Sequence, residues 1–173
     1  QTPVFVLTDL DIGMNEHLCE PLAWDDAQRY DRGKVMTREA LEAGKEFGRY
    51  LDVDGDGIPY RTYPGTHPTR GAYFTRGTTK DRYARYSETG PDYVDNMQRL
   101  LRKFETAKSL VPKPELTAAE YPARFGAIYY GSTSFAMQEA LRSLAAQGIY
   151  VNALRVRAFP FQDEIAEFVA SHN

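Results

Sequence analysis

The stretch from Asp54 to Gly71 constrains this chain most, because it follows neither helical nor strand periodicity. It combines acids, glycines, prolines, two arginines and a histidine, so it cannot be ordered by burying a regular apolar face. Irregular segments of this length in a compact domain are usually functional or disordered. The aromatic residues in and beside it argue against disorder: Tyr60, Tyr63, Tyr73 and Phe74. We therefore expect a structured loop whose glycines let the backbone approach another group closely.

Composition narrows the function classes. The chain has 173 residues, enough for one domain or parts of two, and a formal net charge of −3. That charge provides no basic field for nucleic acid and no polybasic membrane patch. The single cysteine, Cys19, excludes a disulfide framework or a cysteine-ligated iron–sulfur cluster within the chain, which fits a reducing, cytoplasmic setting. No apolar run approaches the roughly 20 residues that span a bilayer.

The first apolar run, Val4–Leu7, predicts a fully buried parallel strand, whose neighbouring strands should lie upstream. The last residues, Phe168–Asn173, read as the end of a helix with no strand after it. We expect the chain to be an internal piece of a larger subunit. A small complete domain that begins with an edge strand is the alternative.

The middle of the chain is mostly irregular. Residues 20–37 lack a period, and Trp24 is their expected anchor. Thr37 is an N-cap candidate for a short helix from Arg38 to Phe47, with Gly48 as its end. A long irregular connector then covers residues 52–79.

Pro91 begins a long predicted helix that ends before Pro112, since proline suits the first helical turn. Its apolar positions recur at helical spacing and predict the buried face: Val94, Met97, Leu101, Phe104 and Leu110. Lys113–Glu115 is expected to be a stiff linker between two units.

The last unit has the clearest pattern. An apolar strand is predicted over Phe125–Tyr130, a helix over Ser134–Gln147 and a second strand over Ile149–Val156. The inner face of this helix should carry Met137, Leu141, Leu144 and Ala145. A further helix opens at Pro160–Phe161. This β-α-β-α order predicts an α/β fold with a parallel sheet.

The run Asp52–Ile58 resembles the start of a calcium loop, with acids at its first, third and fifth positions and Gly57 at its sixth. The twelfth position is Tyr63 rather than a bidentate glutamate, and Pro59 occupies a position that usually keeps its N–H. Turn formation with aspartate capping is therefore the favoured reading, and calcium binding through Asp52, Asp54 and Asp56 is the alternative.

Four cationic or titratable residues, Arg61, His67, Arg70 and Arg76, follow among glycines. The planar guanidinium suits a carboxylate or a phosphate, whereas ion pairs with local acids such as Asp56 would be the structural alternative. His67 has the chemistry of an acid–base group or a substrate donor, and a structural hydrogen bond is its alternative role.

Two further places fit ligand chemistry. Asp9 and Asp11 flank Leu10 at the carboxyl end of the first predicted strand, where a carboxylate dyad or a simple turn cap would lie. Gly131–Thr133 precedes a helix and would be an anion site or an ordinary N-cap, without the pattern of a phosphate loop or a dinucleotide fold.

Several of these runs together resemble the alpha subunit of the 2-oxoacid:ferredoxin oxidoreductases, above all the bacterial branch that uses 2-oxoglutarate. The resemblance spans almost the whole chain and is carried by these segments: Pro3–Asp9, Gly13–Asn15, Asp54–Thr62, Pro64–His67, Gly71–Gly77 and Asp92–Lys103.

The resemblance implies a thiamine diphosphate enzyme that cleaves a 2-oxoacid, passes electrons through an iron–sulfur cluster to ferredoxin and forms an acyl-CoA. Mg²⁺ would accompany thiamine diphosphate, and a beta subunit would be the partner, carrying the diphosphate motif and the cluster cysteines. Residues 1–18 would end the pyrimidine-binding domain, and residues 125–173 would begin the transketolase C-terminal-like domain. Residues 19–124 would join the two through the short helix, the irregular connector at 52–79 and the long helix.

By this resemblance the connector would lie near the substrate or a subunit interface. Asp56, Arg61, His67 and Arg70 are then the candidate residues for binding the 2-oxoacid or CoA, while catalytic residues stay unassigned and no resident metal is expected on this chain. Two other readings remain open. The chain would be a subunit-assembly module without catalysis, or a calcium-dependent module built on residues 52–57.

Overall fold

The computed structural model describes residues 4–75, 77 and 79–172, so Pro3, the first residue of the runs that carry the family resemblance, lies outside the described residues. Its contacts divide the chain into two compact units. One unit combines Gln1–Trp24 with Leu110–Asn173, and the other is Asp25–Ser109.

A three-stranded sheet forms the centre of the first unit, in the order β1-β3-β2. β2 (Phe125–Tyr130) pairs in parallel with β3 (Val151–Val156), with Phe125 opposite Val151. β1 (Glu115–Thr117) adds an antiparallel edge strand, so part of the predicted linker at Lys113–Glu115 is a strand instead. Ion pairs from Arg155 and Arg157 to Glu115 hold this edge.

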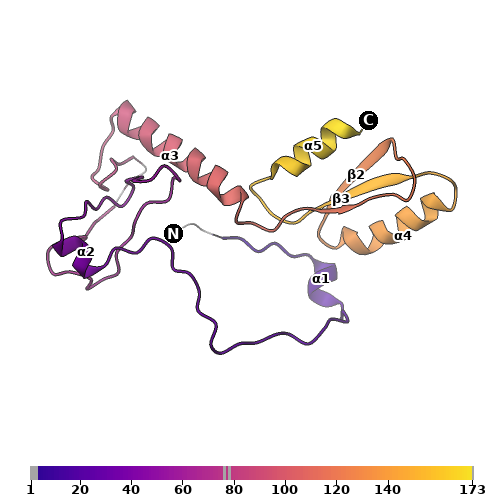
Figure 1. The fold of residues 1–173 in the computed structure, drawn as a ribbon, viewed down its shortest axis with the longest axis horizontal. Coiled ribbons are helices and arrows are strands. Elements are labelled where there is room, and N and C mark those ends of the chain that lie inside the picture. The colour runs from indigo at the N-terminus through magenta and orange to yellow at the C-terminus, as the bar shows by residue number, and fades with distance from the viewer. Residues whose placement is uncertain (1–3, 76, 78, 173) are drawn as a thin grey trace. The chain divides into compact units, whose positions relative to one another are not determined.

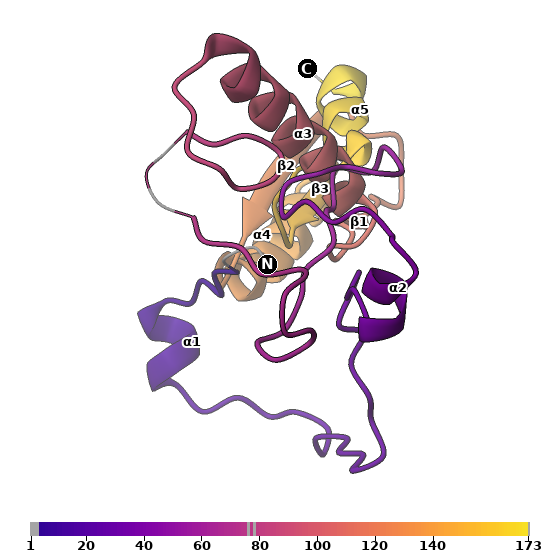
Figure 2. The same cartoon turned by 90° about the vertical axis from the view of Figure 1, so that its left-hand side faces the viewer.

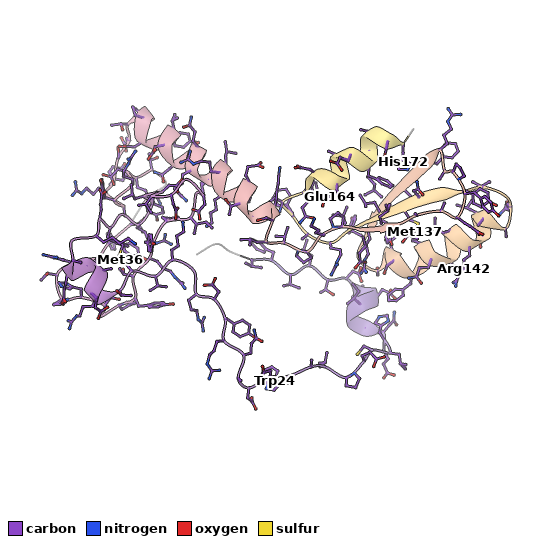
Figure 3. The ribbon with its side chains drawn as sticks, viewed as in Figure 1. Trp24, Met36, Met137, Arg142, Glu164 and His172 are labelled. Atoms are coloured by element: carbon purple, nitrogen blue, oxygen red, sulfur yellow. The ribbon has the colours of Figure 1, made fainter. Side chains whose placement is uncertain are left out.

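Helices α4 (Thr133–Ala145) and α5 (Asp163–Ser171) cover opposite faces of this sheet (Figures 1 and 2). Gly126 permits the close approach of α5, because a Cβ added there would lie 2.8 Å from the ring of Phe168. His172, at the end of α5 (Figure 3), accepts a hydrogen bond on Nε2 from Asn152 Nδ2 at 2.8 Å and donates from Nδ1 to the Phe168 carbonyl. The predicted β-α-β-α order is therefore confirmed.

The predicted inner face of α4 is confirmed in part. Met137, Leu141 and Leu144 are half-buried, whereas Ala145 is exposed at the last residue of the helix. The buried hydrophobic residues of the unit lie on the sheet and α5: Tyr129, Ala153, Leu154 and Phe168.

The prediction of a buried strand at Val4–Leu7 is wrong. These four side chains are 82% to 91% exposed, and none of the strands in the described part of the chain pairs with the segment. A parallel strand needs at least one neighbouring strand to bind its backbone groups, and the described sheet provides none beside this segment. The segment leads into the short helix α1 (Leu10–Met14) instead.

In the second unit, helix α2 (Arg38–Glu42) begins where the sequence predicts, because the Thr37 hydroxyl accepts a hydrogen bond from the Ala40 amide. The predicted end at Gly48 is wrong. Gly44, with φ of +83°, ends the helix, and the amides of Gly44 and Lys45 donate back to the carbonyls of Leu41 and Ala40. This is the glycine-terminated capping pattern common at helix ends.

Helix α3 (Gly90–Lys108) has the predicted proline in its first turn, but its predicted buried face is wrong. The apolar residues of that face are exposed: Val94, Met97, Leu101, Phe104 and Leu110. Asn96 and Arg99 are the buried residues of α3 instead, because this polar side of the helix accepts the irregular connector.

Trp24 is exposed rather than an anchor, and Figure 3 shows it on the irregular segment between α1 and α2. Met36, which Figure 3 labels, is the buried residue of this stretch at 1% exposed. Leu41 and Ala84 are further buried apolar residues of the Asp25–Ser109 unit. No helix among the described residues is long and apolar enough to cross a membrane. The fold is a mixed α/β fold, as the sequence predicts.

Candidate functional site

The acidic residues of the connector gather as the calcium-loop pattern predicts. Carboxylate oxygens of Asp52, Asp54 and Asp56 lie within 4.8 Å of one another. A cation of the chain itself bridges two of them, since Lys34 Nζ lies 2.5 Å from Asp54 Oδ1 and 2.7 Å from Asp56 Oδ2. Arg102 Nε pairs with Asp52 Oδ2 at 3.0 Å. The cluster is therefore largely neutralised by side chains.

The same carboxylates also cap turns, which is the reading favoured from the sequence. Asp52 Oδ1 accepts from the Gly55 amide at 3.0 Å, and Asp56 Oδ1 accepts from the Ile58 amide at 2.7 Å. Partial burial acts to raise the pKa of Asp56, but the hydrogen bonds from Lys34 and from the Ile58 amide outweigh it and hold this pKa below its usual value. Asp56 is thus an ionised structural residue at neutral pH.

The expected close approach of the glycine-rich loop occurs at Gly57. This residue has φ of +76°, and a Cβ there would lie 2.3 Å from the Lys103 amide nitrogen and 2.6 Å from the Arg99 carbonyl oxygen. Arg99 Nη1 donates to the Gly57 carbonyl at 3.1 Å, and Thr106 Oγ1 donates to the Asp56 carbonyl at 2.7 Å. The loop therefore packs on α3 of the same chain.

Arg61 takes part in local structure. Its Nη2 donates to the Arg32 carbonyl at 2.6 Å and to the Tyr63 hydroxyl at 3.1 Å, and its guanidinium lies over the Tyr63 ring. Its backbone pairs beside Val35 in an isolated bridge. An ion pair with Asp56 was the structural alternative for Arg61, and among the described residues Arg61 does not make it.

His67 organises a turn. Its Nδ1 accepts hydrogen bonds from the amides of Thr69 at 3.1 Å and Arg70 at 2.9 Å. In this arrangement the neutral ring carries its proton on Nε2. This geometry matches the structural hydrogen-bonding role that was the alternative for His67, because two backbone amides already bind Nδ1.

Arg70 caps the end of α2, where its Nη1 donates to the carbonyls of Leu41 at 2.7 Å and Glu42 at 3.4 Å. It also lines an open cleft of about 880 Å³ in the Asp25–Ser109 unit. Lys45 and Arg85 line the same cleft, as do the rings of Phe47, Tyr73, Phe74, Tyr83 and Tyr86. Within the described ranges no carboxylate pairs with these three cations, so the cleft fits an anion with a flat ring or an apolar part.

The four predicted binding residues do not converge on one point. The Arg70 amide bond to His67 is the one hydrogen bond or ion pair that joins two of them in the described part of the chain. Arg76 lies outside the described residues. The cleft around Arg70 is the part of the predicted site with a ligand-sized space.

Two buried arginines were missed by the sequence reading. Arg49 is 8% exposed and Arg99 is 6% exposed, although arginine is rarely buried without a partner. A signal for Arg99 exists in the sequence, because Asn96, Arg99, Lys103 and Thr106 form a polar stripe at helical spacing. Arg49 follows Gly48 in an irregular segment and gives no comparable signal.

The predicted anion site at Gly131–Thr133 is occupied by a carboxylate of the chain. Ser132 Oγ donates to Asp9 Oδ2 at 2.7 Å, and Ser132 makes no side-chain cap to its own helix. Asp9 Oδ1 also accepts from the Ile12 amide and caps α1, whereas Asp11 accepts from the Asn15 side chain. Asp9 thus caps α1 and Asp11 binds the Asn15 side chain, which is not the arrangement of a carboxylate dyad.

Comparison with known proteins places these features in context. No protein-family model matches the chain, and no curated protein matches it. A 2-oxoglutarate:ferredoxin oxidoreductase from Magnetococcus marinus, solved with 2-oxoglutarate, coenzyme A and succinyl-CoA bound, has a similar structure. The TM-score is 0.63 at 20% sequence identity, over 75% of this chain and 23% of that chain. The chain therefore shares its fold with about a quarter of that enzyme's chain.

Proposed function

We propose that this chain is part of the alpha subunit of a thiamine diphosphate-dependent 2-oxoacid:ferredoxin oxidoreductase. The observation that carries the proposal is the fold shared with 2-oxoglutarate:ferredoxin oxidoreductase over three quarters of the chain. The sequence runs that resemble this family support it, because several of them lie in the connector that packs on α3 and lines the cleft. A beta subunit and ferredoxin are the proposed partners.

The proposed reaction converts a 2-oxoacid and CoA to an acyl-CoA, CO₂, one proton and two electrons, which ferredoxin accepts. The carbon–carbon bond to the carboxylate breaks, and a thioester bond forms at the remaining carbonyl carbon. Bound thiamine diphosphate supplies the carbanion chemistry of this cleavage. This chain would contribute binding and orientation of the reactants.

The residues present do not fit an iron–sulfur cluster, because one exposed cysteine, Cys19, cannot supply its thiolate ligands. They also do not fit thiamine diphosphate with Mg²⁺. Asp9 already binds the N-terminus of α4, and Lys34 and Arg102 already pair with the acidic cluster. In this proposal both cofactors are held by residues outside the chain.

The cleft at Arg70 fits CoA better. Lys45, Arg70 and Arg85 offer positive charge to phosphates, and Tyr83 and Tyr86 offer rings beside them. We assign this cleft to CoA, and we keep Arg61 as the candidate for the 2-oxoacid carboxylate. In the full enzyme, Arg70→Ala should raise the KM for CoA about tenfold or more, as expected for one lost charge-assisted contact. Arg38→Ala, an exposed change in the same unit, is the control.

The whole proposal is tested by viologen reduction with the full-length parent subunit co-expressed with its genetic neighbour. We expect reduction that requires a 2-oxoacid, CoA and thiamine diphosphate, and that is lost without the neighbour. Absence of activity with every 2-oxoacid tried, in an intact complex loaded with thiamine diphosphate, would refute the proposal.

A subunit-assembly role is a second candidate, favoured by the exposed apolar side of α3 at Val94, Leu101 and Phe104. Under this reading, Leu101→Lys would separate the complex and leave the substrate KM values of the remaining intact complex unchanged. Arg70→Ala would then leave the KM for CoA unchanged as well. Measuring both variants by gel filtration and kinetics distinguishes the two functions.

A further inference from the structure

Three cations surround one ring in the Asp25–Ser109 unit. The distances to the centroid of the Tyr50 ring are 5.5 Å from Arg49 Cζ, 5.6 Å from Arg99 Cζ and 5.2 Å from Lys80 Nζ. Arg49 also lies 5.8 Å from the centroid of the Tyr73 ring. We call Arg49, Lys80 and Arg99 the Tyr50 cation cluster.

The charge of this cluster is not compensated within the described part of the chain. Arg49 makes no hydrogen bond and no ion pair there, and Arg99 donates to the Gly57 carbonyl while its Nε has no partner. Lys80 Nζ donates to Thr75 Oγ1 and to the Gly77 carbonyl, which are neutral acceptors. Arg49 and Arg99 are buried, whereas Lys80 is half-buried. Buried charges are normally paired, so these two guanidinium groups without a carboxylate partner call for a counter-ion.

The carboxylate that acts on Arg99 through space is that of Asp52, and it is already engaged. Its oxygens accept from Arg102 Nε and from the Gly55 amide. Burial and the charge of Arg49 lower the pKa of Arg99, and burial with the charges of Arg99 and Arg49 lowers the pKa of Lys103. The positive charges of Arg49, Arg99 and Lys103 therefore repel one another.

A ligand can reach the cluster. Among the described residues Arg49 makes no hydrogen bond, and none of its nitrogens is among the fully buried unpaired atoms found there, so they keep contact with solvent. Tyr73, which lies against Arg49, also lines the cleft of Arg70. The cluster is thus next to a ligand-sized space in the same unit.

We propose that the Tyr50 cation cluster binds one oxyanion group, a carboxylate or a phosphate of a small molecule. The guanidinium groups of Arg49 and Arg99 supply planar donors suited to either group, and Tyr50 holds both in place. The site is separate from the assignment of Arg61 and Arg70, and it does not depend on the proposed function, since the chain alone should bind the anion.

The test measures hydrogen exchange of the full chain in chloride and in inorganic phosphate at matched ionic strength. At phosphate about ten times its Kd, exchange in residues 48–52 and 96–103 should slow about tenfold. A second arm replaces phosphate with succinate. Protection by phosphate alone assigns a phosphate group, and protection by succinate alone assigns a carboxylate; either result supports the site.

Arg49→Met gives the sharpest contrast. Removing one of the repelling charges should slow exchange in chloride, while further slowing by the anion is lost. Arg38→Met, an exposed arginine in the same unit, should behave as the unchanged chain. A structural role for the stacking of Arg49 predicts the opposite sign, namely faster exchange in both buffers, and would overturn the proposal.

Side-chain NMR keeps the test independent of how well Arg99 variants fold. The Nε–Hε signals of Arg49 and Arg99 should move together as phosphate or succinate is added, with one common Kd. Signals that stay fixed with both anions, or exchange that neither anion slows, would overturn the assignment.

Discussion

Asp9 and Ser132 are joined by a 2.7 Å hydrogen bond from the serine hydroxyl to Asp9 Oδ2, across 123 positions of the chain. Two further contacts fix the same segment, because the Ser132 amide also donates to Asp9 and the rings of His17 and Phe135 stack at 5.0 Å. The carboxylate lies where the helix dipole of α4 favours negative charge. The N-terminal segment is thereby held at the start of α4.

This contact predicts a pH dependence. The hydrogen bond from the Ile12 amide, with that from Ser132, lowers the pKa of Asp9 in the folded chain. The stabilisation is therefore fully present above the unfolded pKa of about 4 and is lost as the pH falls through the lower folded value. The NMR signals of the Ile12 and Ser132 amides should titrate together below about pH 4.

Asp9→Asn should remove this titration, whereas Glu20→Gln, an exposed change in the same segment, should leave it in place. Amide signals that titrate at or above the ordinary aspartate value would contradict the contact.

Gly57→Ala should destabilise the Asp25–Ser109 unit by about 3 kcal/mol, because the new Cβ meets the backbone of α3 at a left-handed φ. Gly55→Ala is the matched control. Its φ is +84°, but its Cβ would meet nothing within 4 Å, so the expected loss is about 1 kcal/mol. Hydrogen exchange of the α3 amides measures both. Equal effects of the two changes would show that the loop does not pack on α3.

Calcium should leave the melting temperature of the chain unchanged, because Lys34 already bridges Asp54 and Asp56. Lys34→Met should create a calcium response by leaving the three carboxylates without that cation. The measurement is a thermal melt with and without calcium. A rise of the melting temperature with calcium in the unchanged chain would contradict this prediction and support a calcium-dependent module at residues 52–57.

His67→Asn should preserve the turn that follows it, since the amide oxygen can accept the bonds that Nδ1 accepts from Thr69 and Arg70. His67→Ala should lose about 1 kcal/mol of stability. In the full enzyme, His67→Asn should retain activity. Normal stability with activity abolished in His67→Asn would instead identify His67 as an acid–base or substrate-binding residue.

The sequence predicts a helix or strand correctly where residues within that one segment are enough to define it. Phe125–Tyr130 is apolar throughout and forms β2 with the predicted bounds, and Pro91 lies in the first turn of α3 as predicted. Thr37 begins α2 as predicted, because its capping hydrogen bond reaches only three residues along the chain, to Ala40. These local rules need no knowledge of distant contacts.

Predictions that depended on a distant partner were less successful. Val4–Leu7 has the composition of a strand but no strand beside it in the described sheet, and α3 buries Asn96 and Arg99 instead of its apolar side. Periodicity identifies an apolar face but does not say which element covers it. The polar side of α3 is buried because its side chains donate hydrogen bonds to the carbonyl groups of the connector.

The candidate site follows the same division. The structured loop, its close approach to another group through a glycine, and the Asp52–Asp56 cluster were predicted from the sequence. Lys34 and Arg49 were not, because they contact their partners from irregular segments that have no periodicity. Their roles depend on three-dimensional proximity, which spacing in the sequence does not encode. Whether Arg61, His67, Arg70 and Asp56 bind a ligand stays a prediction.

The proposed oxidoreductase activity is tested most sharply by the product that the complete complex forms. The full-length parent subunit, purified with its genetic neighbour, is given thiamine diphosphate, CoA, an oxidised viologen and 2-oxoglutarate, and the acyl-CoA is measured by mass spectrometry. We expect one molecule of succinyl-CoA for every two electrons transferred. Viologen reduction without any acyl-CoA, or no turnover of 2-oxoglutarate and other 2-oxoacids by the loaded complex, would contradict it.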